Sequence, residues 1–181
     1  MQNGELFISS RDGVYRIRVV GRATFECAPA LRSLVGNLEQ ESFRQVRIDL
    51  SSCTWMDSTF MGVLAMIGLR AKKISAEAVI VNANAQNENL LCGLGLRKVF
   101  QFTAEESGSS EPGPGEEAKT ASSAPASPAD LDNAKTVLAA HETLMDVDEE
   151  NKRKFGNVVS MVRQEIRKKE GQEEKDSSGP R

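Results

Sequence analysis

The sequence predicts an α/β fold with a mixed β-sheet, followed by a linker and a C-terminal helical extension. Strand-like segments with a two-residue period alternate with helix-like segments across residues 1–103, and such alternation is typical of parallel strands joined by right-handed crossovers. The composition changes at residue 104, and apolar residues recur at helical spacing after residue 130. These three observations divide the chain into 1–103, 104–129, 130–170 and 171–181.

The N-terminal segments predict a β-hairpin. The stretch ELFIS is followed by the turn sequence RDG at 11–13 and then by GVYRIRVVGR, which places Tyr15, Ile17 and Val19 on one face of a half-buried strand. Because the strands of a hairpin are antiparallel, this pair makes the sheet mixed.

The following segments alternate helix and strand. FECAPALRSLVGNLEQ has helical spacing with Pro29 in its first turn, QVRIDLS is strand-like, and STFMGVLAMIGLRAKK is a helix with a cationic end. AEAVIVNA is a further strand, and NAQNENLLCGLGL is a helix with Asn84 as N-cap and glycines at its end. RKVF closes this part, with room for one more short strand.

The second half of the chain changes character. Residues 104–129 contain five acidic residues, one basic residue and four of the six prolines, so we expect a disordered acidic linker rich in Pro, Gly and Ser. Residues 130–170 predict one bent helix or a helical hairpin, with Asp146 and Glu149 as a capping pair. One apolar stripe is Leu131, Ala134, Leu138, His141 and Met145, and the other is Phe155, Val158, Val159, Val162 and Ile166. Residues 171–181 are expected to be a disordered tail.

Composition disfavours several functions. The net charge is −3 and aromatic residues make up 5% of the chain, which argues against nucleic-acid binding. The N-terminal residues do not have the pattern of a signal peptide and no stretch approaches ~18 consecutive apolar residues, so we expect neither a signal peptide nor membrane association. The three cysteines, Cys27, Cys53 and Cys92, lack metal-ligand spacing and suit a reducing compartment. A cytoplasmic location is therefore expected.

Catalytic residues are scarce. His141 is the single histidine and lies on a helix stripe beyond the linker, so a structural role is favoured over a catalytic triad or a metal site. Asp49 and Asp57 flank a strand end and a helix start, and capping is favoured there over an acid–base pair. We expect neither an enzyme nor a cofactor.

The stretch WMDSTFMG, residues 55–62, is the most informative part of the sequence. Asp57 or Ser58 suits the N-cap of the next helix. That helix is apolar almost all round, so it is either fully buried or has an apolar face that awaits a partner. A partner surface beginning at Ser58 is one of these two alternatives.

The run VRIDLSSCTWMDSTFMGVLAMIGLRAKK, followed by AVIVNANAQNENLLCGLGLRKVF, resembles the STAS domain of bacterial anti-sigma factor antagonists over about residues 5–103. The resemblance implies a mixed sheet of four to five strands with helices mainly on one side. It also implies that Ser58 is the phosphoacceptor, with Thr59 as a second candidate. Phe60 and Met61 stand where the family has glycine and leucine.

The implied function of this family is control of transcription through protein–protein interaction. The unphosphorylated domain would bind an anti-sigma factor that is also a serine kinase, and a PP2C-type phosphatase would remove the phosphate. The implied partner-binding residues are Asp57, Ser58, Thr59, Phe60 and Met61. A non-switching STAS scaffold or adaptor in a signalling or transport assembly is the alternative, and self-association through the C-terminal helices also stays open.

Overall fold

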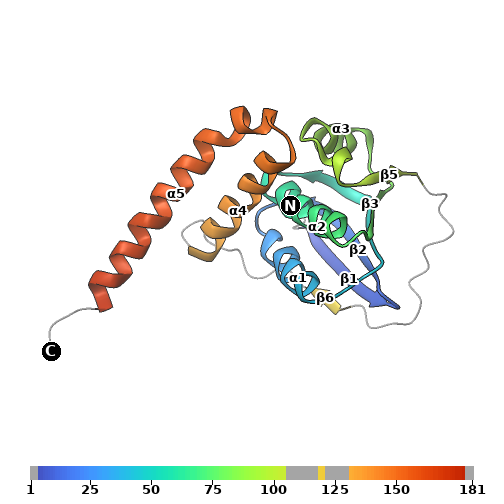
Figure 1. The fold of residues 1–181 in the computed structure, drawn as a ribbon, viewed down its shortest axis with the longest axis horizontal. Coiled ribbons are helices and arrows are strands. Elements are labelled where there is room, and N and C mark those ends of the chain that lie inside the picture. The colour runs from blue at the N-terminus through green and yellow to red at the C-terminus, as the bar shows by residue number, and fades with distance from the viewer. Residues whose placement is uncertain (1–3, 105–117, 121–130, 178–181) are drawn as a thin grey trace.

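The computed structural model describes residues 4–104, 118–120 and 131–177. These residues form a sheet with the strand order β5-β4-β3-β2-β1-β6, covered on one side by helices (Figure 1). The strands are β1 (Glu5–Arg11), β2 (Val14–Ala23), β3 (Gln45–Met56), β4 (Glu77–Val81), β5 (Gln101–Thr103) and β6 (Ala118–Thr120). The helices are α1 (Ala28–Gln40), α2 (Ser58–Lys73), α3 (Ala85–Gly93), α4 (Leu131–Val147), α5 (Glu150–Ser177) and a 3-10 turn, η1 (Leu96–Lys98).

The expected hairpin and mixed sheet are confirmed. Strands β1 and β2 pair antiparallel, and Arg11 opposite Val14 leaves a two-residue loop. Asp12 and Gly13 in that loop have φ values of 52° and 74°, as a type I′ turn requires. Strands β2, β3, β4 and β5 are parallel neighbours, so the crossover prediction is confirmed as well.

The core lies between the sheet and helices α1 and α2. Ile17 and Val19 of β2 are buried as their alternation predicts, and Ile48 and Leu50 of β3 are buried beside them. Pro29 occupies the first turn of α1, and Asn84 caps α3 by accepting a hydrogen bond from the backbone N–H of Asn87.

The region after residue 103 differs from the expectation in three respects. Most of the expected linker lies outside the described residues, but Ala118–Thr120 forms β6, which pairs antiparallel with β1 at the sheet edge. Helix α5 continues to Ser177, into the expected tail. The cap between α4 and α5 is Asp148, whose carboxylate accepts the N–H of Glu150, and not Asp146.

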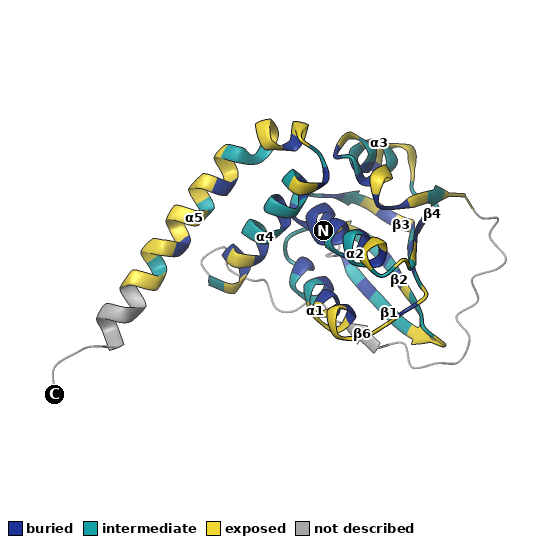
Figure 2. Ribbon diagram, viewed as in Figure 1, coloured by how far each residue is buried: buried dark blue, intermediate teal, exposed yellow. Residues whose placement is uncertain are grey.

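Helices α4 and α5 form a hairpin that packs on the sheet-bearing domain through α4 (Figure 1). Ion pairs Arg163–Glu142 and Lys135–Glu170 show that the two helices run antiparallel. Of the expected α4 stripe only Ala134 and His141 are buried, because the buried face is rotated toward α2. Its members are Asn133, Ala134, Thr136, Ala140, His141, Leu144 and Val147. Most of α5 remains exposed (Figure 2).

The docked hairpin decides between the two alternatives for the apolar helix. Ten residues of α2 are buried, because the sheet, α1 and α4 all pack against it. In this docked arrangement α4 of the same chain covers the face that begins at Ser58, and the use of that face by a partner stays a prediction.

Candidate functional site around Ser58

The Asp57 carboxylate ties the start of α2 to the turn before α1. Its Oδ1 accepts the backbone N–H of Phe60 at 2.8 Å, which makes Asp57 the N-cap, as expected. Its Oδ2 accepts the N–H of Phe25 at 2.7 Å, and its own N–H donates to the carbonyl of Ala23 at 3.0 Å. Since hydrogen bonds to a charged acceptor are the strong ones, Asp57 is a rigid support for the residue that follows.

Ser58 is the first residue of α2, is half-buried, and contacts a residue 83 positions later in the chain. Its Oγ lies 2.9 Å from Nε2 of His141. The other ring nitrogen, Nδ1, lies 2.8 Å from the carbonyl of Val137. A carbonyl only accepts, so Nδ1 carries a proton, and in the neutral ring Nε2 accepts the hydroxyl proton of Ser58. The ring also packs edge-on against Phe155, with centroids 4.9 Å apart.

Helix α4 approaches α2 most closely one turn beyond Ser58. A Cβ atom placed on Gly62 would lie 2.4 Å from the carbonyl oxygen and 2.7 Å from the Cβ of Ala140. Only glycine therefore permits this approach, and Ala140 precedes the histidine that contacts Ser58. The sequence contains both residues, but their contact depends on how two distant helices pack.

The five expected partner-binding residues are not equally accessible. Asp57 and Ser58 are partly exposed, whereas Thr59, Phe60 and Met61 are 6%, 0% and 4% exposed. With α4 docked, the accessible part of the expected surface is thus limited to the first two residues.

The orientation of Phe60 shows how this residue, which stands where the family has glycine, affects access to Ser58. A helix turns by about 100° per residue, so Phe60 lies roughly 200° around α2 from Ser58 and packs into the core. Its ring therefore does not obstruct a partner that approaches Ser58. The glycine that allows close approach on the Ser58 face is Gly62 instead.

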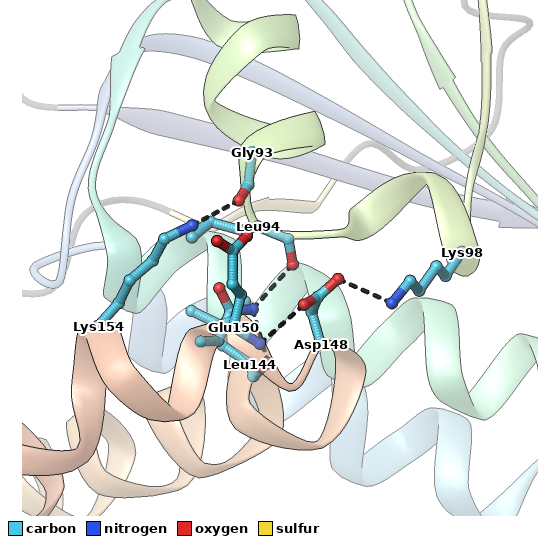
Figure 3. A network of polar contacts seen from close by, with 8 residues as sticks. Gly93, Leu94, Lys98, Leu144, Asp148, Glu150 and Lys154 are labelled. Atoms are coloured by element: carbon cyan, nitrogen blue, oxygen red, sulfur yellow. Dashed lines mark hydrogen bonds and ion pairs between the residues drawn. The ribbon is translucent and has the colours of Figure 1, made fainter.

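A second contact region holds the corner between α4 and α5 (Figure 3). The side chain of Asn151 is fully buried and its Nδ2 donates to the carbonyls of Leu94 and Leu144 at 2.9 and 2.8 Å. One of these acceptors belongs to the loop after α3 and the other to α4. Asn151 therefore joins the hairpin to the domain through hydrogen bonds to backbone carbonyls.

Charged contacts surround this buried amide. Asp148 pairs with Lys98 at 2.7 Å, and the Lys98 ammonium holds the pKa of Asp148 below its usual value. Lys154 donates to the carbonyl of Gly93 at 2.9 Å. Gly95 has a φ of 81°, and a Cβ there would lie 2.9 Å from the Asp148 side chain. Gly93 and Gly95, the glycines expected to end the third helix, thus also contact residues of the corner between α4 and α5.

The Ser58–His141 pair has the spacing of a nucleophile and its base, but its surroundings differ from those of a catalytic triad. The orienting partner of the imidazole is a helix carbonyl rather than a carboxylate, and the ring is 4% exposed. Asp49 accepts the N–H of Ser51 within β3 and Asp57 caps α2, so each of the two aspartates considered as an acid–base pair binds local backbone instead. The geometry is that of a packed helix interface.

Other site classes find little support among the described residues. No group of three or more His, Cys, Asp or Glu side chains is placed to hold a metal within the described part of the chain. Cys27 and Cys53 are buried free thiols, and burial raises the pKa of Cys27 to about 11. A cavity of about 140 Å³ lies away from Ser58, beside Asn82 and Phe102. None of the helices within 4–104 and 131–177 is long and apolar enough to cross a membrane.

Comparisons with known proteins complete this description. The anti-sigma factor antagonist SpoIIAA of Bacillus, in its unphosphorylated form, is 10% identical with a TM-score of 0.47, over 57% of this chain and 88% of that one. An anti-sigma factor antagonist from Mycobacterium paratuberculosis is 23% identical with a TM-score of 0.45, over 56% and 86%. The murine anion transporter Slc26a9 is 18% identical with a TM-score of 0.41, over 54% and 19%.

A search of curated proteins finds no match to this sequence. The model of the STAS domain family matches residues 8–108. That match spans more than half of the chain and includes β2, α2 and Ser58, and the observed sheet and helices are those expected of the family. The chain belongs to the STAS domain family.

Proposed function

We propose that this protein is a STAS-domain binding module of the anti-sigma factor antagonist type, controlled by phosphorylation of Ser58. The observation that carries the proposal is the position of the Ser58 hydroxyl. It lies at the first residue of α2, next to an aspartate whose two oxygens are fully used in the fold. Modification of Ser58 would therefore alter the surface while the Asp57 clamp stays in place.

A phosphate at this position has two opposing effects. The helix N-terminus favours an anion, because its first N–H groups and the dipole point toward it. The phosphate also adds roughly −1.5 to −2 charges beside Asp57, on the face where α2 is otherwise apolar. The domain would remain folded, whereas a partner docked on this face would have to desolvate or repel the new charge.

The proposed partners are those that the resemblance to anti-sigma factor antagonists implies. The unphosphorylated form would bind an anti-sigma factor that acts as a serine kinase, and a PP2C-type phosphatase would regenerate it. The module itself would carry out no catalysis. One observation favours the alternative of a non-switching scaffold: Ser58 is half-buried and hydrogen-bonded to His141.

Mass spectrometry after incubation with ATP and a host extract tests the proposal. Trypsin releases Ser58 within residues 48–70, which also contain Ser51, Ser52, Thr54 and Thr59, so fragment ions must assign the site. We expect one phosphate on Ser58 in the wild type and none in Ser58→Ala. An unmodified Ser58 in an extract that phosphorylates other sites of the chain would favour the scaffold.

A binding assay with an anti-sigma factor kinase of the host then tests the switch. Ser58→Asp should bind it at least tenfold more weakly than the wild type, while Ser58→Ala retains binding. Equal binding by both variants would contradict the proposal.

A further inference from the structure

We infer that the α4–α5 hairpin is an intramolecular gate on Ser58, and that a docked hairpin and a phosphate on Ser58 exclude each other. The inference rests on the proposed function of Ser58 and adds its regulation. The docked hairpin would withhold the hydroxyl from the kinase and the Ser58 face of α2 from the partner. Both would act on the undocked form.

The first argument is space. The Ser58 Oγ and His141 Nε2 are 2.9 Å apart, which is hydrogen-bond contact and leaves no room for a phosphoryl group. A small displacement of α4 cannot create that room while the packing is kept, because Gly62 contacts the backbone of Ala140 in the next turn. Phosphorylation thus requires that α4 leaves this part of α2.

The second argument is the direction of the hydrogen bond. Nδ1 of His141 donates to the carbonyl of Val137, so the neutral ring presents an acceptor to Ser58. The serine hydroxyl can donate to it, but a phosphate dianion has no proton to donate. Modification therefore removes the proton that Ser58 donates in this contact, and the contact can persist only if Nε2 gains a proton of its own.

The third argument is how the hairpin is attached. At the corner, Asn151 and Asp148 hold the domain through polar contacts to Leu94 and Lys98, which a change at Ser58 leaves intact. Along α4, by contrast, the contact with α2 includes the Ser58 hydroxyl, which is the proposed site of modification. The hairpin can thus undock from the Ser58 region while it remains tied to the domain.

The gate also identifies what the partner must provide. The face of α2 covered by α4 carries Ser58 and Gly62, and it receives a helix whose small residue, Ala140, lies against the glycine. A partner that competes for this face would present a helix with a small side chain at the same place. The apparent affinity of the partner would be proportional to the fraction of molecules in which the hairpin is undocked, so it would be low when most molecules are docked.

Cysteine labelling of the full-length chain tests the access that α4 controls. Ser58→Cys is combined either with Ala140→Leu, which forces bulk against Gly62, or with Ala139→Leu as the matched control at a half-buried neighbour. N-ethylmaleimide should label the thiol introduced by Ser58→Cys at least tenfold faster with Ala140→Leu than with the control. The native thiols of Cys27 and Cys53, which are buried, should stay unlabelled and report an intact domain. Cys92 is partly exposed, so labelling of each thiol is followed on its own peptide. Equal labelling rates in the two backgrounds would overturn the gate.

Hydrogen exchange provides a second measurement that does not depend on Ala140→Leu. If labelling shows that Ala140→Leu exposes the buried thiols, hydrogen exchange alone tests the gate. Ser58→Glu is compared with Ser52→Glu, which adds the same charge at an exposed position of β3. We expect the amides of residues 131–147 to exchange at least tenfold faster in Ser58→Glu alone. Equal protection of α4 in both variants would refute the mutual exclusion. It would also be refuted if a protonated His141 formed a stable ion pair with the carboxylate introduced by Ser58→Glu and so kept α4 docked.

Neither measurement uses a kinase or a partner, so the gate and the phosphoswitch can fail separately. If the hairpin undocks but Ser58 is not phosphorylated, the hairpin still controls access to the Ser58 face of α2 and the phosphoswitch is rejected. Phosphorylation of Ser58 with α4 still protected would support the switch and reject the gate.

Discussion

Replacement of Gly62 by alanine measures how tightly the hairpin packs on α2. In the interior of a helix, alanine is favoured over glycine by ~1 kcal/mol, because it loses less backbone entropy. The new Cβ, however, would lie 2.4 Å from the carbonyl oxygen of Ala140. A backbone oxygen cannot rotate away as a side chain can, and overpacking of this kind costs about 1–3 kcal/mol. We therefore expect Gly62→Ala to lower the free energy of unfolding by about 0–2 kcal/mol.

Gly36 provides the matched control. It lies within α1, and no atom is found within 4 Å of the position its Cβ would take. Gly36→Ala should therefore show the propensity gain alone and stabilise the protein by ~1 kcal/mol. The two substitutions are chemically identical, so the difference between them, about 1–3 kcal/mol, isolates the contact with α4.

Urea unfolding followed by the fluorescence of Trp55, the single tryptophan, gives both free energies. Hydrogen exchange of α4 should show faster exchange in Gly62→Ala and no change in Gly36→Ala. If Gly62→Ala stabilises the protein as much as Gly36→Ala does, α4 does not press on Gly62 in solution, and the packing argument behind the gate is wrong.

Three further predictions concern the supports of the site. Asp57→Ala removes the acceptor of two backbone hydrogen bonds. It should lower the free energy of unfolding in urea by about 2–4 kcal/mol, because bonds to charged groups contribute about 1.5–3 kcal/mol each and part of this is recovered from water. A loss below about 0.5 kcal/mol, the lower end for an ordinary hydrogen bond, would contradict the clamp. Asn151→Ala removes the side-chain donor from the buried carbonyl of Leu94 and leaves the carbonyl of Leu144 with the N–H of Asp148. It should therefore cost about 2 kcal/mol and speed exchange in α4 and α5, and unchanged exchange in both helices would count against the corner anchor. Burial raises the pKa of Cys27 from 9.0 to about 11, so its contribution is present below pH 9 and is lost as the pH rises through 11. Between pH 9 and pH 11 the wild type should lose about 2 kcal/mol more than Cys27→Ala, and parallel pH profiles would refute the assignment.

Local sequence signals predicted most of the sheet-bearing domain. The Asp12–Gly13 turn, the Asp57 and Asn84 caps and the alternation around Ile17 depend on residues close in the chain. Turn geometry and capping are satisfied within a few residues, so the sequence reports them directly. The family resemblance rests on these same segments, which is why fold and family could both be predicted.

The environment of Ser58 could not be predicted in the same way. His141 was expected on an apolar stripe as a structural residue, and its burial agrees with that, but its contact with Ser58 spans 83 positions. The expected α4 stripe is also rotated, because α4 packs against both α2 and α5. A helix with two packing partners does not show a single apolar face, so its periodicity understates what it contacts. The uniformly apolar character of α2 was the available signal, and it is compatible with both burial and partner binding.

The sequence by itself determined the strand and helix order up to residue 103, the caps of α2 and α3, the β1–β2 hairpin and the presence of a serine at the start of α2. Only the tertiary structure decided that the C-terminal hairpin covers that serine, that Phe60 faces the core and that Gly62 receives Ala140. The physical reason is that caps and turns are satisfied by neighbours in the chain. The cover over α2, in contrast, comes from a helix that begins more than fifty residues after α2 ends, and its position depends on close packing that no local pattern records.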